Sequence, residues 1–222
     1  GHSQGGHAVL GAAQYASRAQ LNYKGTVAIA PASNLASILT IGEQQASTLP
    51  INYQIQMLAQ LDTYTALIVA GMQGHNKSVT YNEVFKNDTV ILAPIAEAEC
   101  SSTVGVQLGT AMSIYAAGIG QGTLTGYGRL QSGFMSIPVI DTFLKKDSQP
   151  GLAPLNKKVF IYQGEADTTV PKAATDLLIA SMKANGTSAS NIQYTTSAAW
   201  DHGTVYTQNY TSFVDNIDSL FQ

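Results

Sequence analysis

The first six residues of the chain, Gly1-His2-Ser3-Gln4-Gly5-Gly6, contain a serine in a position where it could act as a nucleophile. They fit the G-x-S-x-G pattern of a nucleophile elbow, a sharp strand-to-helix turn that holds a serine in a strained conformation with its hydroxyl exposed. We expect the three glycines to remove β-carbons that would clash in such a turn. Because small-residue turns are common, this interpretation depends on finding partners for Ser3.

A serine hydroxyl needs a base to take its proton, and the base is usually a histidine that an acid orients. Of the four histidines, only His202 lies in a loop after a late predicted strand and just before the last helix. His2 should point away from the serine on a tight turn. His7 belongs to the helix after the elbow, and His75 to a surface-like turn. We therefore assign the base to His202.

Three acidic residues, Glu165, Asp167 and Asp201, lie close to the ends of late strands. Asp167 follows a buried strand by a few residues and precedes a helix, where an acid of a parallel sheet belongs. Asp201 is adjacent to His202, so its carboxylate can hardly reach the far side of that ring, and it suits a helix N-cap or a surface charge. Asp167 is the preferred acid, and Glu165, in the same loop, is the fallback.

The elements expected around these residues alternate between helix and strand at both ends of the chain. Helices are expected where small or apolar residues recur at helical spacing, and the apolar runs of the first two expected strands suit a sheet covered on both faces. In chain order they are a helix over 7–20, a strand over 26–30, a strand over 159–162, a helix over 171–185, a strand over 191–195 and a closing helix with an apolar stripe over 206–221.

The middle of the chain has a different character. Apolar residues recur at helical spacing over 51–72, and further helices are expected over 95–104, 111–117 and 137–146. A segment of about 110 residues is much longer than an ordinary loop. We therefore expect two domains: an α/β core formed by 1–34 and 150–222, and a mainly helical insertion over 35–149.

A nucleophile elbow follows a strand, and only Gly1 and His2 precede Ser3 here. We expect that strand, and the sheet around it, to lie upstream, so that the chain is the C-terminal part of a longer protein. The absence of an initial Met agrees with this expectation.

Composition excludes several other classes of function. Charged residues make up 11% of the chain and its net charge is −3, with no basic run, so we expect no nucleic-acid partner. No apolar run reaches the 18 residues of a membrane span. Gly118-x-Gly-x-Gly122 does not follow a strand, which argues against a nucleotide loop, and no residue cluster has the spacing of metal ligands. We therefore expect no cofactor and no metal.

Two features bear on the location of the protein. The single Cys100 is either free or paired with a residue upstream of the chain. N-x-S/T triplets occur at Asn76, Asn87, Asn185 and Asn209 and permit glycosylation, which gives mild support for secretion.

The segments GHSQGG, FIYQGEADTTVP and DHGTVY, in this order, resemble the α/β-hydrolase superfamily. More narrowly, the elbow with its double glycine, the strand ending in Ala30-Pro31, the long helical insertion and the G-E-A-D-x-x-V-P segment resemble the secretory lipase family of fungi and bacteria. The resemblance implies an α/β-hydrolase fold, with the C-terminal part of a mostly parallel sheet and flanking helices, plus a helical lid or cap that binds the acyl group.

By the same resemblance, Ser3 is the nucleophile, Asp167 the triad acid and His202 the base. The backbone N–H of Gln4 is then the remaining oxyanion donor, because the family's other donor comes from an N-terminal half with no counterpart here. Losing one such donor typically costs about 10²–10³ in kcat, so we expect the isolated chain to be a poor catalyst.

The sequence thus predicts a serine carboxylester hydrolase, a lipase or esterase, that is extracellular and acts on small-molecule or lipid esters. Transient contact with a lipid interface is compatible with this prediction, and its structural partner would be the missing N-terminal part. A peptidase or an acyltransferase on the same fold stays open, because fold does not fix the substrate. A non-catalytic, hydrolase-like binding module is the third alternative.

Overall fold

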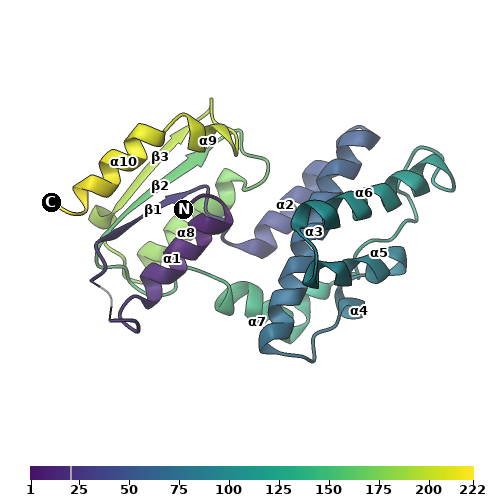
Figure 1. Ribbon diagram of the computed structural model, residues 1–222, viewed down its shortest axis with the longest axis horizontal. Helices are drawn as coiled ribbons and strands as arrows, with labels where there is room; N and C mark the ends of the chain where they lie inside the picture. The colour runs from purple at the N-terminus through teal and green to yellow at the C-terminus, as the bar shows by residue number, and fades with distance from the viewer. Residues whose placement is uncertain (21) are drawn as a thin grey trace. The chain divides into compact units, whose positions relative to one another are not determined.

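The computed structural model describes residues 1–20 and 22–222. This part of the chain divides into two compact units, one formed by Gly1–Ile38 and Leu144–Gln222 and the other by Leu39–Phe143 (Figure 1). The boundaries expected from the sequence, after residues 34 and 149, fall four and six residues from these. The first unit contains strands and helices, and the second is mainly helical.

The first unit is built on three parallel strands in the order β1-β2-β3: β1 (Gly25–Ile29), β2 (Lys158–Gly164) and β3 (Ile192–Ser197). The register pairs Val27 with Phe160 and Ile161 with Tyr194. The three strands expected from the sequence are therefore confirmed, with ends shifted by one or two residues. His2 forms a parallel bridge with Ile29, so the first residues of the chain lie beside β1.

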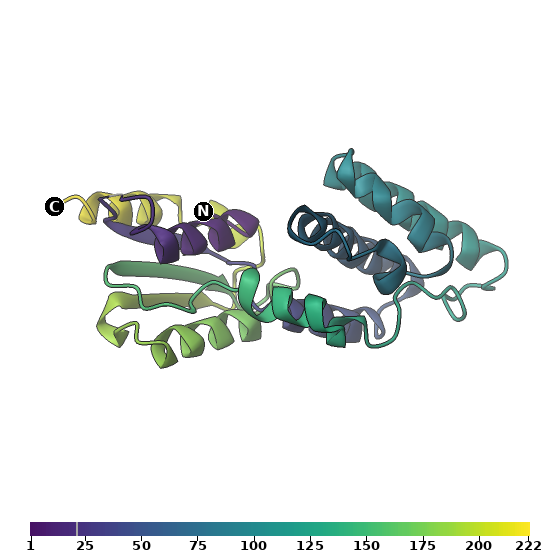
Figure 2. The same cartoon turned by 90° about the horizontal axis from the view of Figure 1, so that it is seen from below.

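Helices cover both faces of this sheet, which explains the continuous apolar runs of β1 and β2. Figure 2 shows α8 (Lys172–Ala184) and α10 (Tyr210–Ser219) on opposite sides of the strands. The core of one face includes Leu10 and Ala13 of α1 (Gln4–Tyr15) together with Ala28, Val159, Ile161, Leu178 and Met182. The core of the other includes Val27, Ile29, Phe160, Tyr162, Val205 and Phe213.

The prediction of one closing helix over 206–221 with an apolar stripe facing the core is wrong in two respects. The segment is divided into α9 (Thr204–Thr207) and α10, because the side-chain amide of Asn209 donates to the Val205 carbonyl that a continuous helix would use for a backbone bond. Of its expected apolar stripe only Phe213 is buried. The others, Tyr206, Tyr210, Val214, Ile217 and Phe221, are 39–71% exposed.

The second unit consists of helices, with a single bridge between Phe85 and Leu130 among its described residues. The helix expected over 51–72 is confirmed as part of α3 (Ile51–His75). The helix expected over 95–104 is wrong, because the chain turns at 98–100 between η1 (Ala93–Glu97) and α6 (Ser101–Ala117). The other helices here and at the unit boundaries are α2 (Leu35–Ala46), α4 (Tyr81–Val84), α5 (Asn87–Leu92), η2 (Phe134–Ser136), α7 (Pro138–Thr142) and the π-helix η3 (Phe143–Asp147).

No helix within the described ranges is both long and apolar enough to cross a membrane. Cys100 is exposed and unpaired directly before α6.

A buried ion cluster stabilises the second unit. The Arg129 guanidinium donates from Nε and Nη2 to the carboxylate of Asp62 on α3, at 2.8 and 2.6 Å. It also binds both oxygens of Glu43 on α2. Asp62 is fully buried, so Arg129 provides the positive charge that keeps its carboxylate from being an isolated charge in an apolar interior.

Replacing Arg129 with Met should therefore lower the free energy of unfolding by about 3–5 kcal/mol at neutral pH, because the charge of Asp62 is left buried and unpaired. Burial already raises the pKa of Asp62, and loss of the cation raises it further. Since the unfolded carboxyl titrates at lower pH, the loss should grow as pH rises from about 4 to 7.

Urea unfolding at several pH values measures both effects. Lys172→Met is the matched control, because Lys172 pairs with Asp176 on the exposed surface of α8, where such pairs contribute about 0–1 kcal/mol. Equal losses in the two variants would contradict the assignment of a buried cluster.

Candidate active site

Ser3 occupies a strained turn between the bridge at His2 and helix α1. Its φ of 56° and ψ of −119° lie in a region that residues with a β-carbon rarely adopt. The neighbouring backbone holds it there: Ser3 N–H donates to Ile29 O at 2.8 Å, and the Ser3 carbonyl accepts from the N–H groups of His7 and Ala32. This is the geometry expected of a nucleophile elbow.

Two of the three elbow glycines are required by their surroundings, and the third is not. A β-carbon on Gly1 would lie 2.2 Å from the Gly5 carbonyl oxygen, and one on Gly6 would lie 2.9 Å from the Ile29 oxygen and 3.0 Å from the Pro31 Cα. A β-carbon on Gly5 would meet nothing within 4 Å. The expectation that Gly5 removes a clash is therefore wrong, because its Cα faces open space.

The backbone N–H of Gln4 is available to a ligand. Gln4 is the first residue of α1, where backbone N–H groups have no partner within the helix. Among the described residues, no acceptor binds this N–H. The positive end of the helix dipole also lies here, so the position beside Ser3 favours a developing negative charge.

Asp167 lies beyond the end of β2 and is almost fully buried. Its Oδ1 accepts the backbone N–H groups of Thr169 and Val170, at 2.9 and 2.8 Å. Its Oδ2 accepts the side-chain amide of Gln163 at 3.2 Å. These neutral donors fix the orientation of the carboxylate and compensate for its removal from water.

His202 lies in the loop after β3 and contacts the Asp167 carboxylate. Its Nδ1 lies 2.7 Å from Oδ2 of Asp167, and its side chain remains partly accessible. Because an ionised carboxylate can only accept, Nδ1 carries the proton in the neutral ring. The Nε2 atom is then left with the lone pair that a general base needs.

The structure brings Asp167 and His202 into direct contact, and it links Ser3 to them through its neighbour in the chain. Nε2 of His2 lies 2.8 Å from the carbonyl oxygen of His202, so the elbow and the His202 loop are side by side. Within the described residues, no hydrogen bond joins the Ser3 hydroxyl to the His202 ring. Hydrogen bonds between catalytic groups are often long in structures without substrate and shorten when substrate binds.

The other two acids considered for the site face elsewhere. Glu165 is exposed, and its carboxylate accepts the Thr196 hydroxyl. The Oδ1 of Asp201 accepts the N–H groups of Gly203, the N-cap residue of α9, and of Thr204, the first residue of that helix. Asp201 is therefore not the N-cap itself, but its side chain binds backbone donors at the start of α9. The bond from the Thr204 N–H lowers the pKa of Asp201 and keeps it ionised.

Of the remaining histidines, His2 contacts the candidate site through its side chain, whereas His7 does so through its backbone N–H. The ring centroid of His2 lies 4.6 Å from that of His202 and 5.6 Å from that of Tyr206. His7 is half-buried on α1, and burial lowers its pKa. His75 ends α3 in the other unit. The contact of His2 with His202 was missed from the sequence, because the two residues are 200 positions apart.

Gln163 is the second contributor that the sequence did not reveal. Its buried amide donates to Asp167 and to Val170 O, while its carbonyl accepts the Thr175 hydroxyl from α8. A glutamine within an otherwise apolar strand was the available signal, since a buried amide must find partners.

The loops that carry the acid and the base are joined to each other. Glu165 N–H donates to Ser197 O, and Ala166 N–H donates to Trp200 O. A β-carbon on Gly164 would lie 2.3 Å from the Trp200 carbonyl oxygen. The absence of a side chain at Gly164 is therefore what allows the two loops to approach. Trp200 itself packs against the core that contains Tyr162.

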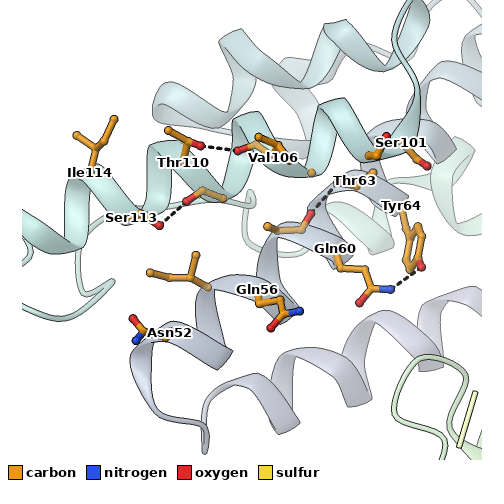
Figure 3. A pocket seen from close by; sticks show the side chains of 15 residues that line it. Asn52, Gln56, Gln60, Thr63, Tyr64, Ser101, Val106, Thr110, Ser113 and Ile114 are labelled. Atoms are coloured by element: carbon orange, nitrogen blue, oxygen red, sulfur yellow. Dashed lines mark hydrogen bonds between the residues drawn. The ribbon is translucent and has the colours of Figure 1, made fainter.

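The helical unit contains an open groove of about 800 Å³ between α3 and α6 (Figure 3). Its described lining carries no charge and combines amides, hydroxyls and glycines with the ring of Tyr64 and a few aliphatic side chains. The lining residues labelled in Figure 3 are Asn52, Gln56, Gln60, Thr63, Tyr64, Ser101, Val106, Thr110, Ser113 and Ile114.

No group of three His, Cys, Asp or Glu side chains in the described part of the chain is arranged to hold a metal ion.

Comparison with known proteins supports the fold. No protein-family model matches the chain, and no curated protein matches its sequence. Among solved structures, a presumed hydrolase from Legionella pneumophila is 12% identical with a TM-score of 0.67, covering 99% of this chain and 55% of its own. The rice cell wall degrading esterase LipA from Xanthomonas oryzae is 15% identical with a TM-score of 0.61, over 99% and 55%.

The chain thus spans about half the length of the structures that it matches. The mixed α/β architecture, with a three-stranded parallel sheet and flanking helices, agrees with these hydrolase neighbours and is consistent with an α/β-hydrolase-like fold. At 12–15% identity the likeness concerns the fold and does not reach the secretory lipase family.

Replacing Gly6 with Ala should lower the free energy of unfolding by about 1–3 kcal/mol, because the new methyl group meets backbone atoms that cannot move aside. Gly5→Ala is the control from the same turn and should change stability by less than about 1 kcal/mol. Urea unfolding measures both variants. A Gly5 variant as unstable as the Gly6 variant would show that the surroundings of the two glycines are wrongly described.

Replacing Gly164 with Ala should separate the His202 loop from Asp167 and weaken the hydrogen bond between them. The expected result is loss or broadening of the low-field proton NMR signal of the His202 Nδ1–H. Gly203→Ala is the matched control, because its β-carbon would lie 3.7 Å from the nearest atom. An unchanged signal in the Gly164 variant would mean that the loops do not need this glycine.

Proposed function

We propose that the chain carries the catalytic residues of a serine carboxylester hydrolase, a lipase or esterase of the kind that the secretory lipases represent. The observation that supports this proposal best is the 2.7 Å contact between His202 Nδ1 and Asp167 Oδ2 at the same sheet edge as the strained Ser3 turn. The esterase and hydrolase names of the structural neighbours agree with it.

In the proposed reaction, Nε2 of His202 takes the proton of the Ser3 hydroxyl while the serine oxygen bonds to the ester carbonyl carbon. The carbonyl oxygen becomes an oxyanion that the Gln4 N–H stabilises. When the tetrahedral intermediate collapses, the ester bond breaks and the alcohol leaves with the proton from His202. A water molecule, deprotonated by His202, then attacks the acyl-enzyme. The bond from the acyl carbon to the Ser3 oxygen breaks, His202 returns the proton to that oxygen, and the acid is released.

Asp167 would support both proton transfers without changing its own protonation. Its bond to Nδ1 selects the tautomer in which Nε2 can accept, and its charge stabilises the imidazolium that forms. The N–H groups of Thr169 and Val170 and the Gln163 amide hold the carboxylate still during these steps.

Further parts of the proposal concern the protein around this site. A second oxyanion donor would come from a segment upstream of Gly1, and the helical unit would act as a lid or cap. The substrate would be a small-molecule or lipid ester, met in part at a lipid interface. Secretion has mild support from the N-x-S/T triplets, although the buried and hydrogen-bonded Asn209 is poorly suited to glycosylation.

The proposal predicts that Ser3→Ala and Asp167→Asn each lower kcat for p-nitrophenyl esters by about 10⁴-fold in the full-length protein, because the nucleophile or the correct tautomer is lost. Asp201→Asn is the matched control and should change kcat by less than about threefold, since that carboxylate binds the backbone N–H groups of Gly203 and Thr204. Equal effects at positions 167 and 201 would contradict the choice of acid.

Two further measurements separate the alternatives. A fluorophosphonate probe should label Ser3, as identified by mass spectrometry of the labelled peptide, and an absence of labelling would favour a non-catalytic binding module. Esters of increasing chain length should be hydrolysed in preference to peptide and aminoacyl substrates. Hydrolysis of peptides alone would replace the esterase by a peptidase.

A further inference from the structure

We propose that His2 is a positioning residue. It connects the turn that carries Ser3 to the loop that carries His202, and it keeps the His202 ring in a fixed position relative to Ser3. This inference rests on the proposed function and adds a residue that the serine–histidine–aspartate arrangement does not include. His2 makes its two kinds of contact, a hydrogen bond and a ring contact, with the same residue.

The hydrogen bond fixes the main chain of the base. Nε2 of His2 lies 2.8 Å from the carbonyl oxygen of His202, and a carbonyl can only accept, so His2 donates from Nε2. Asp167 holds the ring of His202 through Nδ1, while His2 holds the backbone from which that ring projects. The two contacts together restrict both ends of the side chain.

Ring contacts add to this restraint. The centroid of the His2 ring lies 4.6 Å from that of His202, with an angle of 38° between the ring planes. The His2 ring also stacks on the ring of Tyr206 of α9, with 5.6 Å between the centroids and 27° between the planes. Tyr206 in turn lies 6.1 Å from Phe213, which belongs to the sheet core. His2 therefore connects the base, through the partly exposed ring of Tyr206, to the buried ring of Phe213.

The main chain of His2 is itself immobilised by β1. The carbonyl of Gly1 accepts from Ile29 N–H and the N–H of Ser3 donates to Ile29 O, both at 2.8 Å, so His2 is held from both sides. Its backbone is directly bonded to Ser3. A displacement of His202 relative to the nucleophile would thus require the His2 side chain to break its contacts.

The charge of His2 suits this role. Burial lowers the pKa of His2, and the nearby His202 and the Gly1 amino group lower it further. The bond to the His202 carbonyl and the charge of Asp167 raise it, but the net shift is downward. The net effect keeps His2 neutral at neutral pH. A neutral neighbour does not repel the imidazolium that His202 becomes in each catalytic step.

Three substitutions of His2 separate its contacts. His2→Ala removes the donor and the ring, His2→Phe keeps a ring without a donor, and His2→Gln keeps an N–H donor at similar reach. Because misplacement by about 1 Å can cost 10²-fold in rate, we expect His2→Ala to lower kcat by about 10–100-fold with KM changed less than threefold. His2→Gln should recover most of this loss, and His2→Phe only part. His7→Gln is the control, because the His7 side chain bonds to the backbone of Ser148.

The measurements are kcat and KM for a p-nitrophenyl ester across pH 5–9, urea unfolding, and the low-field proton signal of His202 Nδ1–H. The proposal is supported if His2→Ala lowers kcat without lowering the free energy of unfolding, and if His2→Gln restores most of the lost kcat. A wild-type kcat in His2→Ala, or an equal loss in the Gln and Ala variants, would overturn the proposal. So would a loss explained by unfolding, in which His2→Ala and His7→Gln lose stability and activity in parallel.

The proposed function and this inference can fail separately. If Ser3→Ala hydrolyses esters as fast as the wild type, or the wild type hydrolyses none, the proposed function fails. The proton signal still tests the positioning role, because it reports the Asp167–His202 contact without any substrate. Broadening or loss of that signal in His2→Ala but not in His2→Gln supports the role, and an unchanged signal in both variants contradicts it.

Discussion

The buried carboxylate of Asp167 is the group on which the candidate site depends. It accepts two backbone N–H groups, one amide and one imidazole, and it lies in the loop just after β2, a strand that is covered on both faces. Burying a charge costs free energy unless donors replace water. The strand end, the Gln163 side chain and the start of the following loop are arranged to supply those donors, and His202 occupies the remaining position.

Much of this arrangement can be predicted from the sequence, because it follows from local rules. Two short apolar runs predict the covered strands β1 and β2, the segment 191–195 is predicted as a third, and the polar residues after each strand meet at one edge since the strands are parallel. The choice of Asp167 over Asp201 follows from chain geometry, and the hydrogen bonds of both residues agree with it. The strained φ of Ser3 agrees with the pattern of glycines around it.

The errors occur where non-local or side-chain contacts compete with a local pattern. The apolar repeat over 206–221 predicts one helix, but the amide of Asn209 takes a backbone acceptor and divides it. The break before Cys100 ends a helix that periodicity alone would continue. The contact of His2 with His202 depends on how the elbow and a loop 200 residues later meet, and no local rule describes that.

The close approach at Gly164 has a consequence for protein engineering. The loops after β2 and β3 share backbone hydrogen bonds and leave no room for a β-carbon between them. The two loops therefore form one structural unit. Grafting Asp167 or His202 onto another scaffold would require both loops to be transferred together with Gly164.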